Sequence, residues 1–87
     1  MRCYIISYDL RGTRDYESLY KAIKSYPNWA HITESTWAII TERTAVQVRD
    51  DLCQVIDRDD RVFVVKSGTE AAWHNVLCKN KWLKDNL

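Results

Sequence analysis

The sequence has few of the residues that build covalent cross-links or phosphate-binding loops. Its 87 residues include two glycines, one proline and three cysteines. Cys3, Cys53 and Cys78 are odd in number, widely spaced and without a C-x-x-C pair, which argues against a disulfide framework and a zinc cage. There is also no glycine-rich phosphate loop. We therefore expect neither soft-metal chemistry nor loop-based nucleotide binding.

Histidine is equally scarce, and the usual catalytic sets are missing. His31 and His74 are isolated and have no partner at metal-ligand spacing, so we interpret them as surface or interface side chains. Neither a Ser-His-Asp set nor a Cys-His pair is evident. The acidic run Asp57-Arg58-Asp59-Asp60 fails the calcium-loop pattern and is interpreted as a solvated turn.

The chain lacks an excess of either charge and a long apolar run. Thirteen basic and twelve acidic residues give a formal net charge of +1, which argues against a strongly basic nucleic-acid wrapper but allows a small basic site. No stretch approaches the roughly 20 apolar residues that span a bilayer, and the N-terminus has no apolar signal region. We expect a cytoplasmic protein with no membrane partner.

Apolar and aromatic residues, in contrast, are plentiful. Hydrophobic residues make up 46% of the chain and include four tryptophans and five tyrosines, which predicts one folded domain over residues 1–87. A domain of this size buries only about 60–65% of its unfolded surface and is marginally stable alone. We therefore expect a homodimer.

The first half of the chain alternates strand and helix patterns. Arg2–Asp9 is rich in β-branched and aromatic residues on both alternating faces, which predicts a central strand. Asp15–Ser25 carries one apolar stripe and predicts an amphipathic helix that Pro27 stops. Trp29–Thr41 predicts either two short strands that meet near Glu34-Ser35 or one strand kinked by a bulge.

The second half repeats the pattern. Thr44-Ala45-Val46-Gln47 matches a capping box and predicts a helix to about Ile56. A charged turn over 57–61 leads to a strand over Val62–Lys66, which Ser67-Gly68 ends. The order β-α-β-β-α-β predicts an α+β, ferredoxin-like fold: a four-stranded antiparallel sheet with two helices on one face.

Residues 68–87 form a C-terminal extension that is rich in large apolar side chains. We predict an extra strand near Ala71–Leu77 and a short helix near Lys81–Asn86. The first strand is apolar on both faces, so its second face needs a cover, and a second copy of the chain is the natural candidate. We place the extension at this dimer interface, but the sequence leaves open whether it docks on its own domain or on the partner.

Asp9 is the best candidate for functional chemistry, because it ends a central strand beside a loop that holds Arg11 and Arg14. A carboxylate here can bind Mg²⁺ or Mn²⁺, and the arginines can hold phosphate. A single carboxylate is a poor metal site, and a second Asp9 across a two-fold axis would supply another ligand. The alternative interpretation is a turn aspartate that accepts backbone hydrogen bonds. Ser35 is a candidate helper with an exposed hydroxyl.

Tyr8-Asp9-Leu10, followed by Arg11 and Arg14, resembles the end of the first strand in the CRISPR-associated protein 2 superfamily. A second similarity is Glu34-Ser35-Thr36-Trp37, which resembles that family's polar-x-Ser-x-aromatic pattern. The element order over Arg2–Lys66 is similar as well. The superfamily includes stand-alone members and the toxin-like virulence-associated protein D.

The resemblance implies a homodimer in which Asp9 of each chain faces a shared cleft. It implies a metal-dependent endonuclease or endoribonuclease acting on RNA or double-stranded DNA, with Asp9 as metal ligand. The alternative function is a catalytically inactive dimeric interaction or scaffold module, related to toxin–antitoxin pairs or to CRISPR adaptation. Two features of the sequence argue against tight binding of nucleic acid. The net charge is close to zero, and Gly12-Thr13 separate Arg11 from Arg14. Base stacking stays open for Trp29 and Trp73 only, which flank loops.

Overall fold

The computed structural model describes all residues, from Met1 to Leu87. Its four strands form one antiparallel sheet in the order β2-β3-β1-β4, so β1 is central, as predicted. The ferredoxin-like α+β fold is therefore confirmed. The elements in chain order are β1 (Arg2–Asp9), α1 (Tyr16–Lys24), β2 (Asn28–Thr33), β3 (Thr36–Thr41), α2 (Ala45–Cys53), β4 (Arg61–Lys66) and α3 (Asn80–Asn86).

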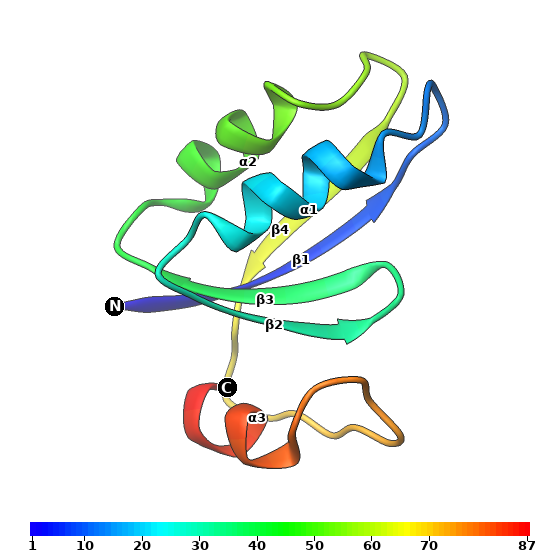
Figure 1. Ribbon diagram of the computed structural model, residues 1–87. Coiled ribbons are helices and arrows are strands. Elements are labelled where there is room, and N and C mark those ends of the chain that lie inside the picture. The colour runs from blue at the N-terminus through cyan, green and yellow to red at the C-terminus, as the bar shows by residue number, and fades with distance from the viewer.

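The main core lies between the sheet and the two long helices. Figure 1 shows α1 and α2 side by side on one face of the sheet. Strand alternation turns Tyr4, Ile6 and Tyr8 of β1 toward these helices, and all three are buried. Each helix packs one apolar stripe against these side chains, because residues three and four apart share a helix face. The fully buried members of these stripes are Leu19, Ile23, Val48 and Leu52.

Two local signals in the sequence set the boundaries of β2, β3 and α2. Glu34-Ser35 is a turn between two separate strands, so the first of the two alternatives for this region is correct. At the start of α2 the Thr44 hydroxyl accepts from the Gln47 N–H at 3.2 Å, and the Gln47 side chain accepts from the Thr44 N–H at 3.0 Å. The predicted capping box is confirmed.

Helix α2 ends at Cys53, earlier than the predicted end near Ile56. The N–H groups of Gln54 and Val55 bond to carbonyls three residues back, at 3.3 and 3.1 Å, which tightens the chain into a turn. Val55 and Ile56 still pack against the core from this turn. Their apolar spacing continued the helical pattern although the backbone had already left the helix.

The extra strand predicted near Ala71–Leu77 is wrong. A single backbone hydrogen bond, from Leu77 N–H to the Ile32 carbonyl at 2.9 Å, ties this segment to the free edge of β2. Asn75 adopts a left-handed backbone with φ of 56°, which breaks an extended run. The short terminal helix is confirmed as α3. The extension is therefore a loop followed by a helix.

The extension docks on its own domain, on the face of the sheet opposite α1 and α2 (Figure 1). Leu83 of α3 is 1% exposed, and the Trp82 indole donates to the Asn28 side chain of β2 at 3.1 Å. Ala30 of β2 and Ala38 of β3 point to this face and are buried. The extension thus covers the β2–β3 half of the outer face.

The β1–β4 half of the outer face stays uncovered. Phe63 and Val65 of β4 are 63% and 42% exposed, and Ile5 of β1 lies beside Val65 in the sheet. A monomer rarely leaves neighbouring large apolar side chains in water without a use for them. No helix of the chain is both long and apolar enough to span a bilayer.

Candidate functional site

Asp9 lies at the end of β1, directly opposite Arg61 of β4. Its side chain is about half exposed, and its Oδ2 lies 3.0 Å from Nη1 of Arg61 and 3.7 Å from Nη1 of Arg11. Because Tyr8 points toward the helices, strand alternation turns Asp9 toward the outer face. Two guanidinium groups share this carboxylate: that of Arg11, as predicted, and that of Arg61 in place of Arg14.

Two carboxylates from the turn between α2 and β4 hold the loop that carries Arg11. Asp60 Oδ1 accepts the N–H groups of Arg11 and Gly12 at 2.6 and 2.8 Å. Asp57 Oδ2 accepts the N–H and the hydroxyl of Thr13 at 2.6 and 2.9 Å. The interpretation of this acidic run as a solvated turn was incomplete, because Asp57 and Asp60 anchor the β1–α1 loop.

These contacts explain the glycine at position 12. A Cβ on Gly12 would collide with the side chain of Asp57, so only glycine allows this close approach. The backbone bonds also act on the acid itself. The N–H of Gly12, with those of Asp57 and Arg11, lowers the pKa of Asp60 below its ordinary value because they favour the charged carboxylate.

Ser35 shares a cleft with Asp9, whereas Arg14 does not. The cleft has a volume of about 590 Å³ and lies where β1 ends beside the β2–β3 turn. Ser35 reaches it because its carbonyl accepts the Tyr8 N–H at 3.2 Å, which fixes the turn against β1. Arg14 instead sits in a left-handed conformation with φ of 58° and makes no side-chain hydrogen bond or ion pair.

Tyr8 forms the inner wall of this cleft. Its hydroxyl donates to the Glu34 carbonyl at 2.9 Å and accepts from the Trp37 indole at 3.1 Å. Burial, and then the neighbouring Tyr20, raise the pKa of Tyr8 well above its ordinary value. Tyr8 therefore stays protonated at neutral pH, and it positions the turn that carries Ser35.

Arg61, Asp57 and Asp60 are the site residues that the sequence analysis missed. Arg61 is 52 residues from Asp9 and joins it only through the pairing of β1 with β4. The acidic run was visible in the sequence, but its target, the backbone around Gly12, was not. The sequence did contain a signal for this contact. The fold brings the β1–α1 loop, with its glycine, and the α2–β4 turn, with its acidic residues, to the same end of the sheet.

The donor set of one copy is thin for a divalent ion. No three His, Cys, Asp or Glu side chains converge anywhere in the chain. Asp9 alone offers a carboxylate beside two guanidinium groups. Mg²⁺ is commonly held by one or two carboxylates together with substrate phosphate and water. One Asp9 carboxylate is at the lower limit of that range, and it is already paired with Arg61 and Arg11.

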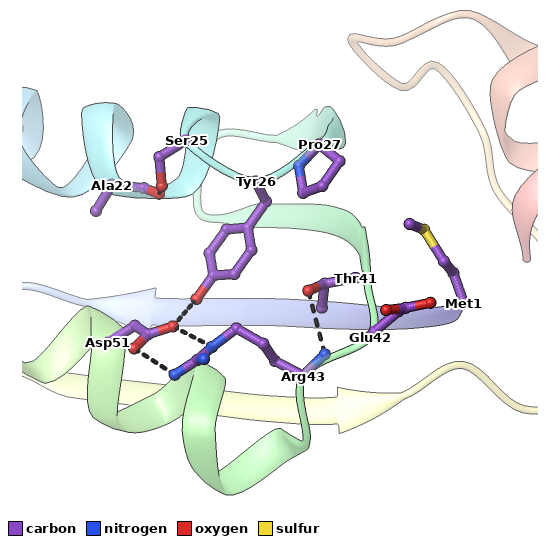
Figure 2. Close-up of a pocket in the computed structure, with 9 residues that line it drawn as sticks. All are labelled: Met1, Ala22, Ser25, Tyr26, Pro27, Thr41, Glu42, Arg43 and Asp51. Carbon is purple, nitrogen blue, oxygen red and sulfur yellow. Dashed lines mark hydrogen bonds and ion pairs between the residues drawn. The ribbon is translucent and has the colours of Figure 1, made fainter.

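A second hollow, of about 660 Å³, lies at the opposite end of the sheet (Figure 2). Arg43 contacts Asp51 through two nitrogens, at 2.8 and 2.9 Å, and the Tyr26 hydroxyl donates to Asp51 at 2.7 Å. Burial, followed by the bond to Asp51, raises the pKa of Tyr26. These groups satisfy one another and tie α2 to the α1–β2 connection, which indicates a structural role.

No family model matches this chain. Among solved structures it is similar to a hypothetical protein, TT1823, from Thermus thermophilus, with a TM-score of 0.68 and 19% sequence identity. The similarity covers 86% of this chain and 92% of the other. At this identity it supports the fold alone.

Proposed function

We propose that this protein is a Mg²⁺- or Mn²⁺-dependent endonuclease or endoribonuclease that acts as a homodimer in the cytoplasm. The observation that carries the proposal is the arrangement at Asp9: an exposed carboxylate at a strand end, with guanidinium groups at 3.0 and 3.7 Å. Guanidinium groups bind phosphate in a charge-assisted, often bidentate way. The resemblance of the Tyr8-Asp9-Leu10 segment to the CRISPR-associated protein 2 superfamily points the same way.

Each side chain has a role in this proposal. Asp9 is the metal ligand, and its charge is balanced by Arg11 and Arg61 until a phosphate takes those guanidinium groups. Arg14, on the same loop but outside the cleft, adds a phosphate contact beyond it. Ser35 faces the same cleft and offers its hydroxyl to the substrate. A bound divalent ion would supply a water of lowered pKa as the nucleophile.

The uncovered half of the sheet supports the homodimer. Asp9 pairs with Arg61 of β4, so the two side chains point to the same face of the sheet. Phe63 and Val65 point to that face as well, because residues two apart on a strand share a face. A two-fold pair that buries Phe63 and Val65 therefore has both Asp9 carboxylates at the rim of one interface. A shared ion would reduce the repulsion between them.

Cleavage assays with matched variants test the proposal. Pure protein is incubated with labelled RNA and duplex DNA, with Mg²⁺, with Mn²⁺ and with EDTA. We expect metal-dependent cleavage that Asp9→Ala and Asp9→Asn abolish and that Asp50→Ala retains, since Asp50 pairs only with Arg49 on the surface of α2. Cleavage that persists in Asp9→Ala would reject the assignment.

A second candidate function is a catalytically inactive dimeric module that binds or bridges partners, as in toxin–antitoxin or CRISPR-adaptation assemblies. The observation that favours it is the 3.0 Å ion pair of Asp9 with Arg61, which leaves the carboxylate compensated without a metal. Calorimetric titration with Mn²⁺ separates the two. The module predicts no metal binding and an intact dimer in Asp9→Ala, and metal binding that this variant removes contradicts it.

A further inference from the structure

A row of partly exposed aromatic rings runs between α1 and β2, from the Asp9 cleft to the edge of the sheet. Tyr16 and Tyr20 of α1 have ring centroids 6.0 Å apart, and Tyr20 lies 5.6 Å from His31 of β2. Trp37 lies under the row, stacked on His31 at 4.0 Å, and Trp29 follows it at 5.5 Å. The row therefore has a buried floor and open members.

The two ends of the row are the most exposed. Tyr16 is 40% exposed and Trp29 is 39% exposed, whereas Trp37 beneath them is 1% exposed. A ring needed only for the core would bury its faces, as Trp37 does. Large aromatic surfaces left open on a rigid floor offer stacking platforms at little entropic cost.

Three hollows lie along this row, and neighbouring hollows share a lining residue. The Asp9 cleft, of about 590 Å³, shares Tyr20 with a hollow of about 810 Å³ on the flank of α1. It shares His31 with a hollow of about 380 Å³ between β2 and the extension, where Trp29 is a wall. Each falls in or near the volume range of ordinary small-ligand sites. We call the surface that these three hollows occupy the aromatic groove.

The charge of the groove distinguishes between possible ligands. Lys21 and Lys24 line its middle beside the carboxylate of Glu17, and Lys79 lines its outer end, whereas Asp9 and Glu34 line its inner end. Basic side chains therefore exceed acidic ones at the middle and the outer end of the groove. The Lys24 ammonium lies 5.3 Å from the ring centroid of Trp29. An ammonium over an exposed indole is held weakly, so a phosphate can take it while a base takes the ring face. Aromatic platforms flanked by cations suit single-stranded nucleic acid.

We propose that the aromatic groove binds a short stretch of single-stranded nucleic acid, with unpaired bases stacked on Tyr16, Tyr20–His31 and Trp29 and phosphates held by Lys21, Lys24 and Lys79. This inference rests on the proposed function only for the class of ligand, nucleic acid, and not for cleavage. Proline-rich peptides also use aromatic grooves, but they carry no phosphates that would match the lysines.

Metal-free binding tests the groove separately from any cleavage. The intact protein is titrated into a fluorescently labelled short oligonucleotide in EDTA at low salt, as single strand and as duplex of the same sequence. We expect the single strand to bind roughly tenfold more tightly, because paired bases offer no free faces for stacking. Equal or tighter binding of the duplex, or preferential binding of a proline-rich peptide, overturns the proposal.

Variants locate the binding surface. Trp29→Ala and Tyr16→Ala are each expected to weaken single-strand binding by roughly tenfold, and Trp29→Phe to retain most of it, because a phenyl ring still stacks. Trp73→Ala is the matched control, since Trp73 lies outside the groove and bonds to Asn80. Unchanged affinity in Trp29→Ala and Tyr16→Ala overturns the proposal.

Photo-crosslinking covers the case in which a variant does not fold. Wild-type protein bound to an oligonucleotide with 5-iodouracil is irradiated, and the crosslinked peptides are identified by mass spectrometry. We expect crosslinks within residues 16–37, and crosslinks confined to residues 61–73 would contradict the groove. Asp50→Asn should bind as wild type in EDTA, since Asp50 lies on the surface of α2 and pairs with Arg49. If the groove binds single strands but no cleavage is found, only the proposed function is rejected. If cleavage is found but the groove variants bind as wild type, only the groove is rejected.

Discussion

Gly12 is the residue on which the β1–α1 loop depends. Its N–H and that of Arg11 are both accepted by Asp60, and the side chain of Asp57 occupies the space where a Cβ would stand. The neighbouring Thr13 uses Asp57 through two atoms. A single added methyl group therefore acts on several hydrogen bonds together.

We expect Gly12→Ala to lower the free energy of unfolding by about 1–3 kcal/mol, because the methyl group displaces Asp57 from Thr13. Urea denaturation followed by circular dichroism measures the loss. Gly68→Ala is the matched control, since nothing lies within 4 Å of its added Cβ, and it should be neutral or slightly stabilising. Equal effects of the two substitutions would contradict the close approach.

Asp60 predicts an acid-dependent contribution to stability. Its ordinary pKa is 3.8 and the folded protein lowers it, so the stabilisation is present above 3.8 and is lost as the pH falls through the folded pKa. We expect Asp60→Asn to destabilise the protein at pH 7 and to differ less from wild type as the pH drops below 3.8. Thermal melts between pH 2 and 7 measure this, with Asp59→Asn as control. A gap that widens in acid would refute the prediction.

At the scale of elements, the sequence predicted what local pattern decides. The apolar stripe of α1, the capping box of α2 and the two-sided strand β1 are all encoded within one segment, and all are found. The segment Ala71–Leu77 was mistaken for a strand because its apolar side chains had to be buried. The segment is a loop instead, in which Trp73 and Val76 are half-buried and Leu77 is exposed, since Asn75 turns the chain and α3 supplies the buried anchor.

The capping box of α2 carries measurable stability. Thr44→Ala removes the acceptor for the Gln47 N–H, and we expect a loss of about 1 kcal/mol in unfolding free energy, within a range of about 0.5–2. Chemical denaturation checks this value. Thr69→Ala is a suitable control, because Thr69 is exposed in the extension. A loss at position 69 as large as that at position 44 would contradict the cap.

The docking of α3 rests on Leu83. Leu83 is 1% exposed and Leu77 is 63% exposed. The same Leu→Ala substitution at both positions therefore separates the effect of burial from the effect of losing a leucine side chain. We expect Leu83→Ala to cost about 2–4 kcal/mol, which corresponds to a lower melting temperature by about 4–8 °C per kcal/mol, and Leu77→Ala to change little. Differential scanning calorimetry measures both. Similar melting temperatures for the two variants would mean that α3 does not dock as described.

At the scale of the whole molecule, the outer face of the sheet is divided in two. The β2–β3 half is covered by the chain's own extension, and the β1–β4 half exposes Phe63 and Val65. The extension therefore cannot also cover β1 and β4. What remains is a narrow apolar strip that ends at Asp9, and any partner of the sheet must meet the strip and the carboxylate together.

We expect a homodimer at micromolar concentration that Phe63→Glu converts to monomer, because a buried unpaired carboxylate is costly in an apolar interface. Sedimentation velocity measures the state. Val46→Glu, at an exposed position on the far side of the molecule in α2, should leave the dimer intact. A monomeric wild type, or a dimeric Phe63→Glu variant, would contradict this.

The candidate site was only partly predictable from sequence, and the reason is distance along the chain. Asp9 and Arg11 are neighbours, so their association was visible. Ser35 joins them because Tyr8 bonds to its turn, and Arg61 joins them because β4 pairs with β1. Arg14 is adjacent in sequence, yet its left-handed backbone takes it out of the group. Which residues belong to the candidate site is decided by long-range strand pairing, and no local sequence pattern encodes that pairing.

The position of α3 in the sequence has a consequence for a shorter chain. Leu83, the buried anchor of α3, follows the sheet and both long helices in chain order. The sheet and both long helices are complete in sequence at Lys66, before the extension begins. A chain that stops at Lys66 presents the whole outer face of the sheet to its surroundings, and the extension through α3 covers half of that face.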